Sequence, residues 1–492
     1  MESFKDSKLG QVPNELWLDI FRYLPRDTIE TISLTSSTFR DVSRPFLFAH
    51  FDFHPYAVGK AGAILLPPNI VIDEALERLE FYTSDDIARH VRSCKIIAWQ
   101  SPLWRKIGAA WSSCKFSVTD SPHTLIAPFF ARLDKFTGLQ SFHAEEIHFT
   151  QSAVASLCRA SSLADFRLVR CTFAAGERID TPSLHLGVSR FSYLHDEFSL
   201  KDGIGLWIPL LRLDTIRELE LTCNPNIIGE SMGSVPLFPL VHTLTITVGG
   251  RGGSYNLSVL SHFPAVEVFS TNASPDSPVT VSTVLPVLRQ YAGPCETIAL
   301  FLPRSTLTHL AIPQCSPRVF IEQLNGNQGP SNMLSLRVAF NSEGFDTKAI
   351  RYIRSFFPEL KELLIGVFHY DRGPDANNIP DPNNIHNMIA MSFIKLGEPF
   401  TLPIGLERMM FTWIIKYAVV RSSYRIEVPA FSDVHDALVR RYPALTTVWL
   451  DGHNFLFCWR KSLYGHFEGK CVATTRVDAQ EMRKGFIRFW SN

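Results

Sequence analysis

A short apolar phrase recurs along most of this chain and constrains its fold more than any other feature. Its first, fourth and sixth positions are apolar, as in Ile216, Leu219 and Leu221. Because 46% of the residues are apolar, many single matches arise by chance, so the interpretation depends on the spacing. Val241 and Phe263, for example, open phrases that lie 22 residues apart. Such a period is typical of chains in which each repeat is one small structural unit.

The phrases extend from residue 91 to residue 450, and several follow a proline, as in FPLVHTL, FPAVEVF, FPELKEL and YPALTTV. One phrase, opened by Leu285 and Leu288, carries Gln290 at its third apolar position. The others are Val91/Cys94/Ile96, Trp111/Cys114/Phe116, Leu163/Phe166/Leu168, Ile216/Leu219/Leu221, Val241/Leu244/Ile246, Phe263/Val266/Val268, Leu307/Leu310/Ile312, Met333/Leu336/Val338, Leu360/Leu363/Ile365 and Leu445/Val448/Leu450.

This pattern resembles degenerate leucine-rich repeats and is most regular between residues 216 and 365. In that family each repeat adds one short strand to a parallel sheet, and a helix or irregular turn leads to the next repeat. Stacking supplies the core, because no single repeat can bury its own apolar edge. We therefore expect an α/β fold with a leucine-rich-repeat-like solenoid. An ordinary α/β domain with parallel strands is the alternative.

Residues 12–48 differ from the repeats and predict three short amphipathic helices. In the first helix, Leu16, Ile20 and Leu24 share one broad face with Trp17 and Phe21. About forty residues cannot bury enough surface to be stable alone. We therefore expect this unit either to offer its apolar face to a partner or to pack on the rest of the chain.

Prolines and capping residues predict where these helices begin and end. Pro25 is expected to stop the first helix, because the residue before a proline is pushed toward an extended conformation. The spacing of Asp27 and Glu30 predicts a capping box at the start of the second helix. Ser36 or Ser37 can cap the third helix, and Pro45 is expected to end it.

The same stretch resembles an F-box, whose pattern is roughly L-P-x-E-L-x-x-x-I-F-x-x-L with downstream L, R-x-F and P-x-L-F elements. Val12 replaces the leading leucine, and Ser37-Thr38 replaces the usual basic residue before Phe39. The F-box resemblance implies binding to the Skp adaptor of cullin-type ubiquitin ligases, and the layout resembles fungal, mushroom-type F-box proteins. It places the following residues in or near the adaptor contact: Pro13, Leu16, Ile20, Phe21, Leu24, Pro25 and Leu34.

The chain therefore divides into a flexible tail (1–9), an F-box (10–50), a helical linker (51–90), a leucine-rich-repeat-like substrate-binding region (91–470) and a C-terminal tail (471–492). A helix is expected from Asp73 to Tyr82, with Ala75, Leu76, Leu79 and Phe81 on its apolar side. Asp451-Gly452 separates two strand-like runs and predicts a hairpin that closes the array. The insertion DRGPDANNIPDPNN at residues 371–384 is a candidate binding loop.

Charge balance and cysteine usage limit which partners and which cellular compartment the chain is expected to have. The 48 basic residues equal the 48 acidic residues, so composition favours neither nucleic acid nor an anionic membrane as a partner. The N-terminus lacks the features of a secretory signal, and the apolar run from Phe411 to Val420 is too short to span a bilayer. None of the nine cysteines forms a C-x-x-C pair. We expect a reducing compartment, the cytoplasm or the nucleus.

Several fragments imitate catalytic or metal-binding motifs. GESMG at 229–233 is flanked by prolines that oppose a nucleophile elbow. GHFEGKC at 465–471 has one residue too few for a phosphate loop, and the glycines at 249–253 lack the third glycine of a dinucleotide fingerprint. His143 and His148, with Glu145 and Glu146, have i, i+5 spacing instead of the i, i+4 spacing of a zinc helix. We therefore expect no catalytic residue, cofactor or metal.

Together these features predict the substrate-recognition subunit of a Skp-cullin-F-box ubiquitin ligase, with an unknown protein substrate bound by the repeats. Ubiquitin transfer would occur on the recruited conjugating enzyme, and this chain would supply proximity. Two alternatives are open. One is an F-box scaffold that acts without ubiquitylation, and the other is an enzyme whose site is assembled from distant residues.

Overall fold

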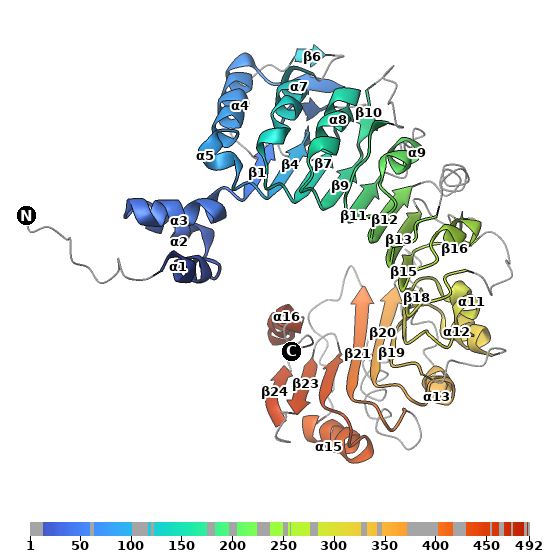
Figure 1. Ribbon diagram of the computed structural model, residues 1–492. Coiled ribbons are helices and arrows are strands. Elements are labelled where there is room, and N and C mark those ends of the chain that lie inside the picture. The colour runs from blue at the N-terminus through green and yellow to red at the C-terminus, as the bar shows by residue number, and fades with distance from the viewer. Residues whose placement is uncertain are drawn as a thin grey trace, which may run out of the picture. The chain divides into compact units, whose positions relative to one another are not determined.

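A computed structural model gives the fold of the protein (Figure 1). It describes residues 13–59, 63–100, 117–119, 123–174, 183–195, 204–223, 237–248, 254–255, 257–275, 284–325, 332–341, 347–370, 402–416, 430–452, 455–461, 467–473, 476–486 and 490. The chain forms two compact units. The first holds Met1–Val241 and Ile246–Arg251, and the second holds His242–Thr245 and Gly252–Asn492.

The first unit begins with the three predicted helices: α1 (Asn14–Phe21), α2 (Arg26–Ser33) and α3 (Ser37–Leu47). The predicted cap of α3 is confirmed, because the Ser36 hydroxyl accepts a hydrogen bond from the Phe39 amide at 3.1 Å. The capping box at Asp27 is wrong, since Pro25 is the N-cap residue of α2. Pro45 does not end α3, which continues to Leu47. A proline in the last turn of a helix removes few hydrogen bonds, so the helix can continue for two more residues.

A parallel sheet follows in the first unit, and its strands are ordered along the chain. They are β1 (His50–Phe53), β4 (Ser93–Ile97), β7 (Ser141–Glu145), β9 (Asp165–Val169), β11 (Arg190–Leu194), β12 (Glu218–Cys223) and then β13 (Thr243–Val248), which has residues in both units. Short strands form two smaller sheets: β2 (Ala57–Val58), β3 (Ile64–Leu66), β5 (Trp99–Gln100) and β6 (Ser117–Thr119), and separately β8 (His148–Phe149) with β10 (Thr172–Phe173). Because β1 pairs with β4, the sheet starts within the stretch expected to be a helical linker.

Helices cover one face of this sheet (Figure 1). They are α4 (Asn69–Tyr82), α5 (Asp85–Ala88), α7 (His123–Ala131), α8 (Gln151–Arg159), α9 (Ile204–Trp207) and the 3-10 helices η3 (Leu133–Lys135) and η5 (Ile208–Leu210). Aromatic side chains from strands and helices meet in the layer between them. Phe51 stacks on Tyr82 with ring centroids 4.4 Å apart, and the ring centroids of Phe166 and Trp207 are 5.5 Å apart. Successive side chains of a strand point to opposite faces, so one face is buried and the other stays open.

The second unit continues the pattern, with parallel strands up to β22 and two antiparallel strands after it. Its main strands are β15 (Val268–Thr271), β17 (Gln290–Ala292), β18 (His309–Cys315), β19 (Ser335–Asn341), β20 (Glu362–Tyr370), β21 (Arg408–Lys416), β22 (Thr447–Asp451), β23 (Leu456–Lys461) and β24 (Phe467–Ala473), and β14 (Ser254–Tyr255) pairs with β16 (Ser274–Pro275). Its helices are η6 (Leu257–His262), η8 (Cys295–Thr297), α11 (Ile298–Phe301), α12 (Pro317–Leu324), α13 (Thr347–Phe356), α15 (Phe431–Arg441) and α16 (Arg476–Lys484). The predicted hairpin is confirmed by the antiparallel pairing of β22 with β23.

Most apolar phrases fall on these strands, with one shift in register. In β15 the buried residue is Phe269, one position after the predicted Val268, and it pairs with the buried Tyr291 of β17. Gln290, which seemed to interrupt its phrase, is therefore exposed on the open face. Three phrases with the same spacing were not predicted, and the structure places them on β7, β11 and β21: Leu139/Phe142/Ala144, Val188/Phe191/Tyr193 and Leu406/Met409/Phe411. The phrase at Trp111 lies outside the described residues.

Part of the stretch expected to be a C-terminal tail (471–492) is folded: among its described residues, 471–473 end β24 and 476–484 form α16. β22 is buried on both faces, whereas β19, farther along the same sheet, alternates between buried and accessible positions. On the second face of β22, Trp449 contacts Phe486 at 4.8 Å. The Asp451 carboxylate accepts two hydrogen bonds from Arg483 of α16, at 2.6 and 2.7 Å. The C-terminal segment therefore covers the open face of the last strands.

Replacing Arg483 with methionine is expected to lower the free energy of unfolding by about 2 kcal/mol, because it leaves the Asp451 carboxylate, 5% exposed, without its cation. Denaturation monitored by tryptophan fluorescence measures this change. The control is Lys484→Met, since the pair of Lys484 with Glu481 is exposed and is expected to contribute less than about 0.5 kcal/mol. Equal losses in the two variants would contradict the structural role of the Arg483 pair.

Candidate protein-binding surfaces

The three N-terminal helices enclose a small core of their own. Phe21, Ile29 and Val42 are buried in it, one from each helix. Partly buried side chains pack against these three, and two of them, Trp17 and Phe39, meet edge to face at 4.9 Å. Such aromatic contacts stabilise a core that is too small to depend on area alone.

Large apolar side chains stay exposed on the surface of the same helices. Leu16 is 53% and Ile20 45% exposed, and both lie one turn apart on α1. Leu34, directly after α2, is 85% exposed. Tyr23, which follows α1, is also largely exposed. An apolar patch of this kind on a small helical unit is a common feature of protein interaction sites.

The seven residues that the F-box pattern singled out are divided by the structure. Pro13 and Pro25 are exposed, like the three apolar residues Leu16, Ile20 and Leu34, and Leu24 is partly buried. Phe21 is only 1% exposed, so its side chain belongs to the helical core and not to the surface. Tyr23 was not among the predicted contact residues, although its place in the pattern, next to Leu24, could have suggested it.

The surface of these helices also carries ion pairs that are accessible to water. Arg22 pairs with Asp19 at 2.8 Å and Arg26 with Glu30 at 3.0 Å. Pairs as exposed as these contribute little to stability. The Arg26 guanidinium also donates to the Leu47 carbonyl at 3.3 Å, which joins the start of α2 to the end of α3.

A second accessible surface is the open face of the sheet in the first unit. Its side chains alternate with the buried ones and are mostly polar, and they come from every strand between β1 and β12. Arg190 and Glu218 form an ion pair across neighbouring strands of this face. On β12 the open-face residues are Glu218, Glu220 and Thr222.

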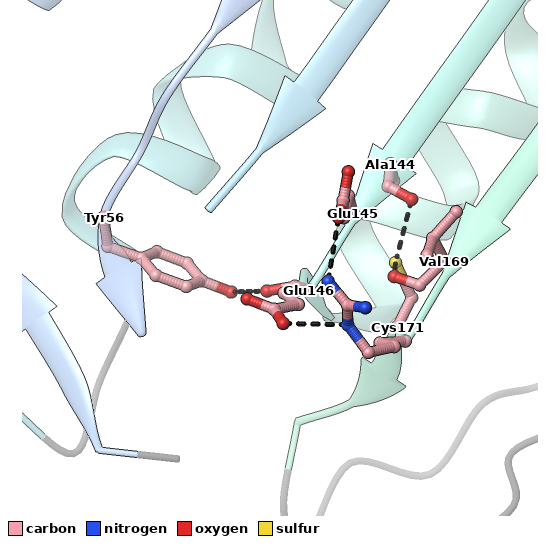
Figure 2. A network of polar contacts seen from close by, with 7 residues as sticks. Tyr56, Ala144, Glu145, Glu146, Val169 and Cys171 are labelled. Atoms are coloured by element: carbon pink, nitrogen blue, oxygen red, sulfur yellow. Dashed lines mark hydrogen bonds and ion pairs between the residues drawn. The ribbon is translucent and has the colours of Figure 1, made fainter. Parts of the chain in front are cut away.

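A polar network holds the carboxyl ends of β7 and β9 (Figure 2). Arg170 donates to Glu145 and to Glu146, each at 2.8 Å. Glu146 and Arg170 both have positive φ, 56° and 51°, so each strand turns sharply at the equivalent place of its repeat. The Cys171 thiol lies within 3.3 Å of the Ala144 carbonyl, and burial raises the pKa of Cys171 to about 12. It is therefore a neutral structural thiol.

Tyr56 joins this network to the end of β1. Its hydroxyl donates to the Glu146 carbonyl at 2.8 Å and accepts from the His148 amide at 3.1 Å. Burial raises the pKa of Tyr56, so the hydroxyl keeps its proton. One side chain therefore satisfies two backbone groups of a neighbouring repeat.

Tyr56→Phe is expected to lower the free energy of unfolding by about 1–3 kcal/mol, because it leaves one buried carbonyl and one amide without a partner. Urea denaturation measures the loss. Tyr82→Phe is the matched control: Tyr82 is also buried, but its hydroxyl makes no hydrogen bond to the described residues, so a change below about 0.5 kcal/mol is expected. A Tyr56→Phe variant as stable as the control would contradict this role.

The motif-like fragments take ordinary places. His143 lies on β7 and His148 on β8, joined by the turn at Glu146. The histidines therefore do not share a helix, and among the residues that the structure describes no group of His, Cys, Asp and Glu could hold a metal ion. Residues 467–471 of the loop-like GHFEGKC form part of β24. The GESMG fragment, the glycines at 249–253 and the insertion at 371–384 lie outside the described residues.

Comparison with known proteins identifies the N-terminal helices. Residues 9–50 match the F-box domain. The search of curated proteins found no match. Among solved structures, the chain is similar to the leucine-rich repeat-containing protein LegL7 from Legionella pneumophila, with 11% identity and a TM-score of 0.33, over 80% of this chain and 98% of that chain. No helix among the described residues is long and apolar enough to cross a membrane.

Proposed function

We propose that this chain is a substrate-recognition subunit of a Skp-cullin-F-box ubiquitin ligase. The proposal depends on one observation: an F-box domain whose own core is complete and which still exposes Leu16, Ile20 and Leu34. Burying these side chains under a second polypeptide would remove apolar surface from water, at about 25 cal/mol for each Å². The Skp adaptor is the partner that covers this surface in F-box proteins.

The sheet region has a different role in this proposal. Its open face presents side chains at regular intervals on a rigid support, which suits recognition of a protein target. The chain would hold the target near the conjugating enzyme that the cullin recruits, and it would raise the local concentration of the target without a catalytic group of its own. This role would place the chain in the cytoplasm or nucleus.

Affinity purification of the full chain from its own cells, followed by mass spectrometry, tests both parts. We expect peptides from a Skp adaptor and a cullin, together with target proteins whose half-lives lengthen when the chain is removed. Adaptor without cullin, with all half-lives unchanged, would favour the scaffold role. Absence of the adaptor would contradict the proposal.

A further inference from the structure

Three cationic or hydrogen-bonding side chains are aligned across the open face of the first unit. Lys95 on β4 pairs in register with His143 on β7, and His143 pairs with Arg167 on β9. Neighbouring strands lie about 4.8 Å apart, so Lys95 and Arg167 are separated by about two such spacings, with the imidazole between them. We call these three residues the cationic row.

Among the described residues, no carboxylate forms an ion pair with the two cations of the cationic row. Within the part of the chain that the structure describes, neither Lys95 nor Arg167 forms an ion pair or a side-chain hydrogen bond. The His143 Nε2 atom is buried and also lacks a hydrogen-bond partner there. Burial is the main cause that lowers the pKa of His143. Lys95 and Arg167 lower it further, whereas the nearby Glu145 and Asp165 carboxylates raise it. Buried polar atoms normally have a hydrogen-bond partner, so this one points to a group that the described residues do not supply.

The acidic side chains around the row are largely engaged elsewhere. Glu145, the next residue of β7 on the same face, is paired with Arg170 (Figure 2). The Asp165 carboxylate accepts a hydrogen bond from Ser141 at 3.3 Å. Asp52 is next to Lys95 in register and is the nearest competing carboxylate. On the other side, Ser192 separates Arg167 from Glu220.

We propose that the cationic row binds a carboxylate side chain from an acidic segment of a target protein. Lys95 and Arg167 have long side chains that can converge on an anion above His143, and the Arg167 guanidinium can hold a carboxylate through two parallel hydrogen bonds. Charge complementarity selects the occupant, because an acidic group would neutralise two cations that the described chain leaves unpaired. This inference rests on the proposed function only in taking the ligand to be a ubiquitylation target.

The test measures binding of a labelled glutamate-rich peptide to the full chain by fluorescence anisotropy. The Lys95→Gln/Arg167→Gln double variant is expected to bind at least about tenfold more weakly than the wild type, since a charge-assisted contact contributes 1.4 kcal/mol or more. The matched control is Lys135→Gln/Arg217→Gln, which removes the same charge from exposed residues outside the row. Its affinity for the peptide is expected to stay within about twofold of the wild-type value, because screened distant charges contribute little. Thermal melting verifies that both variants are folded.

Three results would overturn the inference. The first is failure of the wild type to bind the glutamate peptide. The second is an equal loss of affinity in the two double variants, which would reduce the effect to net charge. The third is binding of a phosphoserine peptide alone, which would exclude a carboxylate as the ligand. Adaptor capture by the same variants is measured in parallel. It is expected to be unchanged, so failure of the cationic row is distinguishable from failure of the F-box assignment.

Discussion

Leu16→Asp/Ile20→Asp is expected to abolish capture of the Skp adaptor by the full chain. Both side chains are about half exposed on α1, so aspartate is tolerated in the free protein. In the complex each aspartate would be a buried charge without a partner. Two such losses of about 3–5 kcal/mol each are comparable to the free energy of a typical micromolar contact, about 8 kcal/mol. A pull-down with purified adaptor measures the effect.

A matched control distinguishes this local effect from non-specific binding through exposed apolar side chains. Ile70 on α4 and Leu206 on α9 are exposed to a similar degree outside the F-box, and Ile70→Asp/Leu206→Asp is expected to capture adaptor like the wild type. Wild-type capture of the adaptor by Leu16→Asp/Ile20→Asp as well as by the control variant would refute the adaptor-binding surface. Loss in both would show that the contact does not depend on the F-box helices alone.

Phe21→Ala is expected to unfold the F-box helices while the sheet stays intact. Removing a fully buried phenylalanine costs about 3–5 kcal/mol, and a core centred on Phe21, Ile29 and Val42 has little stability in reserve. Hydrogen exchange measures the result: amides of α1 to α3 lose their protection, and those of β4 to β12 keep it.

Adaptor concentration separates this variant from the surface variant. Because the adaptor binds only folded helices, an excess of adaptor is expected to restore capture by Phe21→Ala through mass action, but not by Leu16→Asp/Ile20→Asp. Tyr23→Ala is the control for stability, since Tyr23 is largely exposed and its loss is expected to change helix stability by less than about 0.5 kcal/mol. Unchanged protection in Phe21→Ala would mean that Phe21 is not a core residue.

Local patterns were sufficient to predict the three N-terminal helices. The apolar spacing of residues 12–48 predicted three helices, and Ser36 predicted the cap of the third. What periodicity could not distinguish was which apolar residue of α1 faces inward, because Leu16, Ile20 and Phe21 all lie on one broad face. Only the packing of α2 and α3 places Phe21 inside and leaves the other two accessible.

The repeats show the same limit in the strands. Alternating burial was predictable for most phrases, but the shift at Phe269 and Tyr291 was not, since a fixed frame assigns Val268 and Gln290 to the core. A one-residue change in register moves a side chain to the opposite face. β15 and β17 shift by the same one residue, so Phe269 and Tyr291 are still paired in register and both point to the buried face.

The amino-acid order by itself indicated the three N-terminal helices and most of the strands, because the apolar period acts over a few neighbouring residues. It also identified the F-box. The tertiary structure alone decided what those elements leave uncovered: the apolar patch beside Phe21 and the alignment of Lys95, His143 and Arg167, which come from strands far apart in the chain. It also decided that Arg483 reaches Asp451. Exposure and register depend on which distant segments pack together, and no local pattern contains that information.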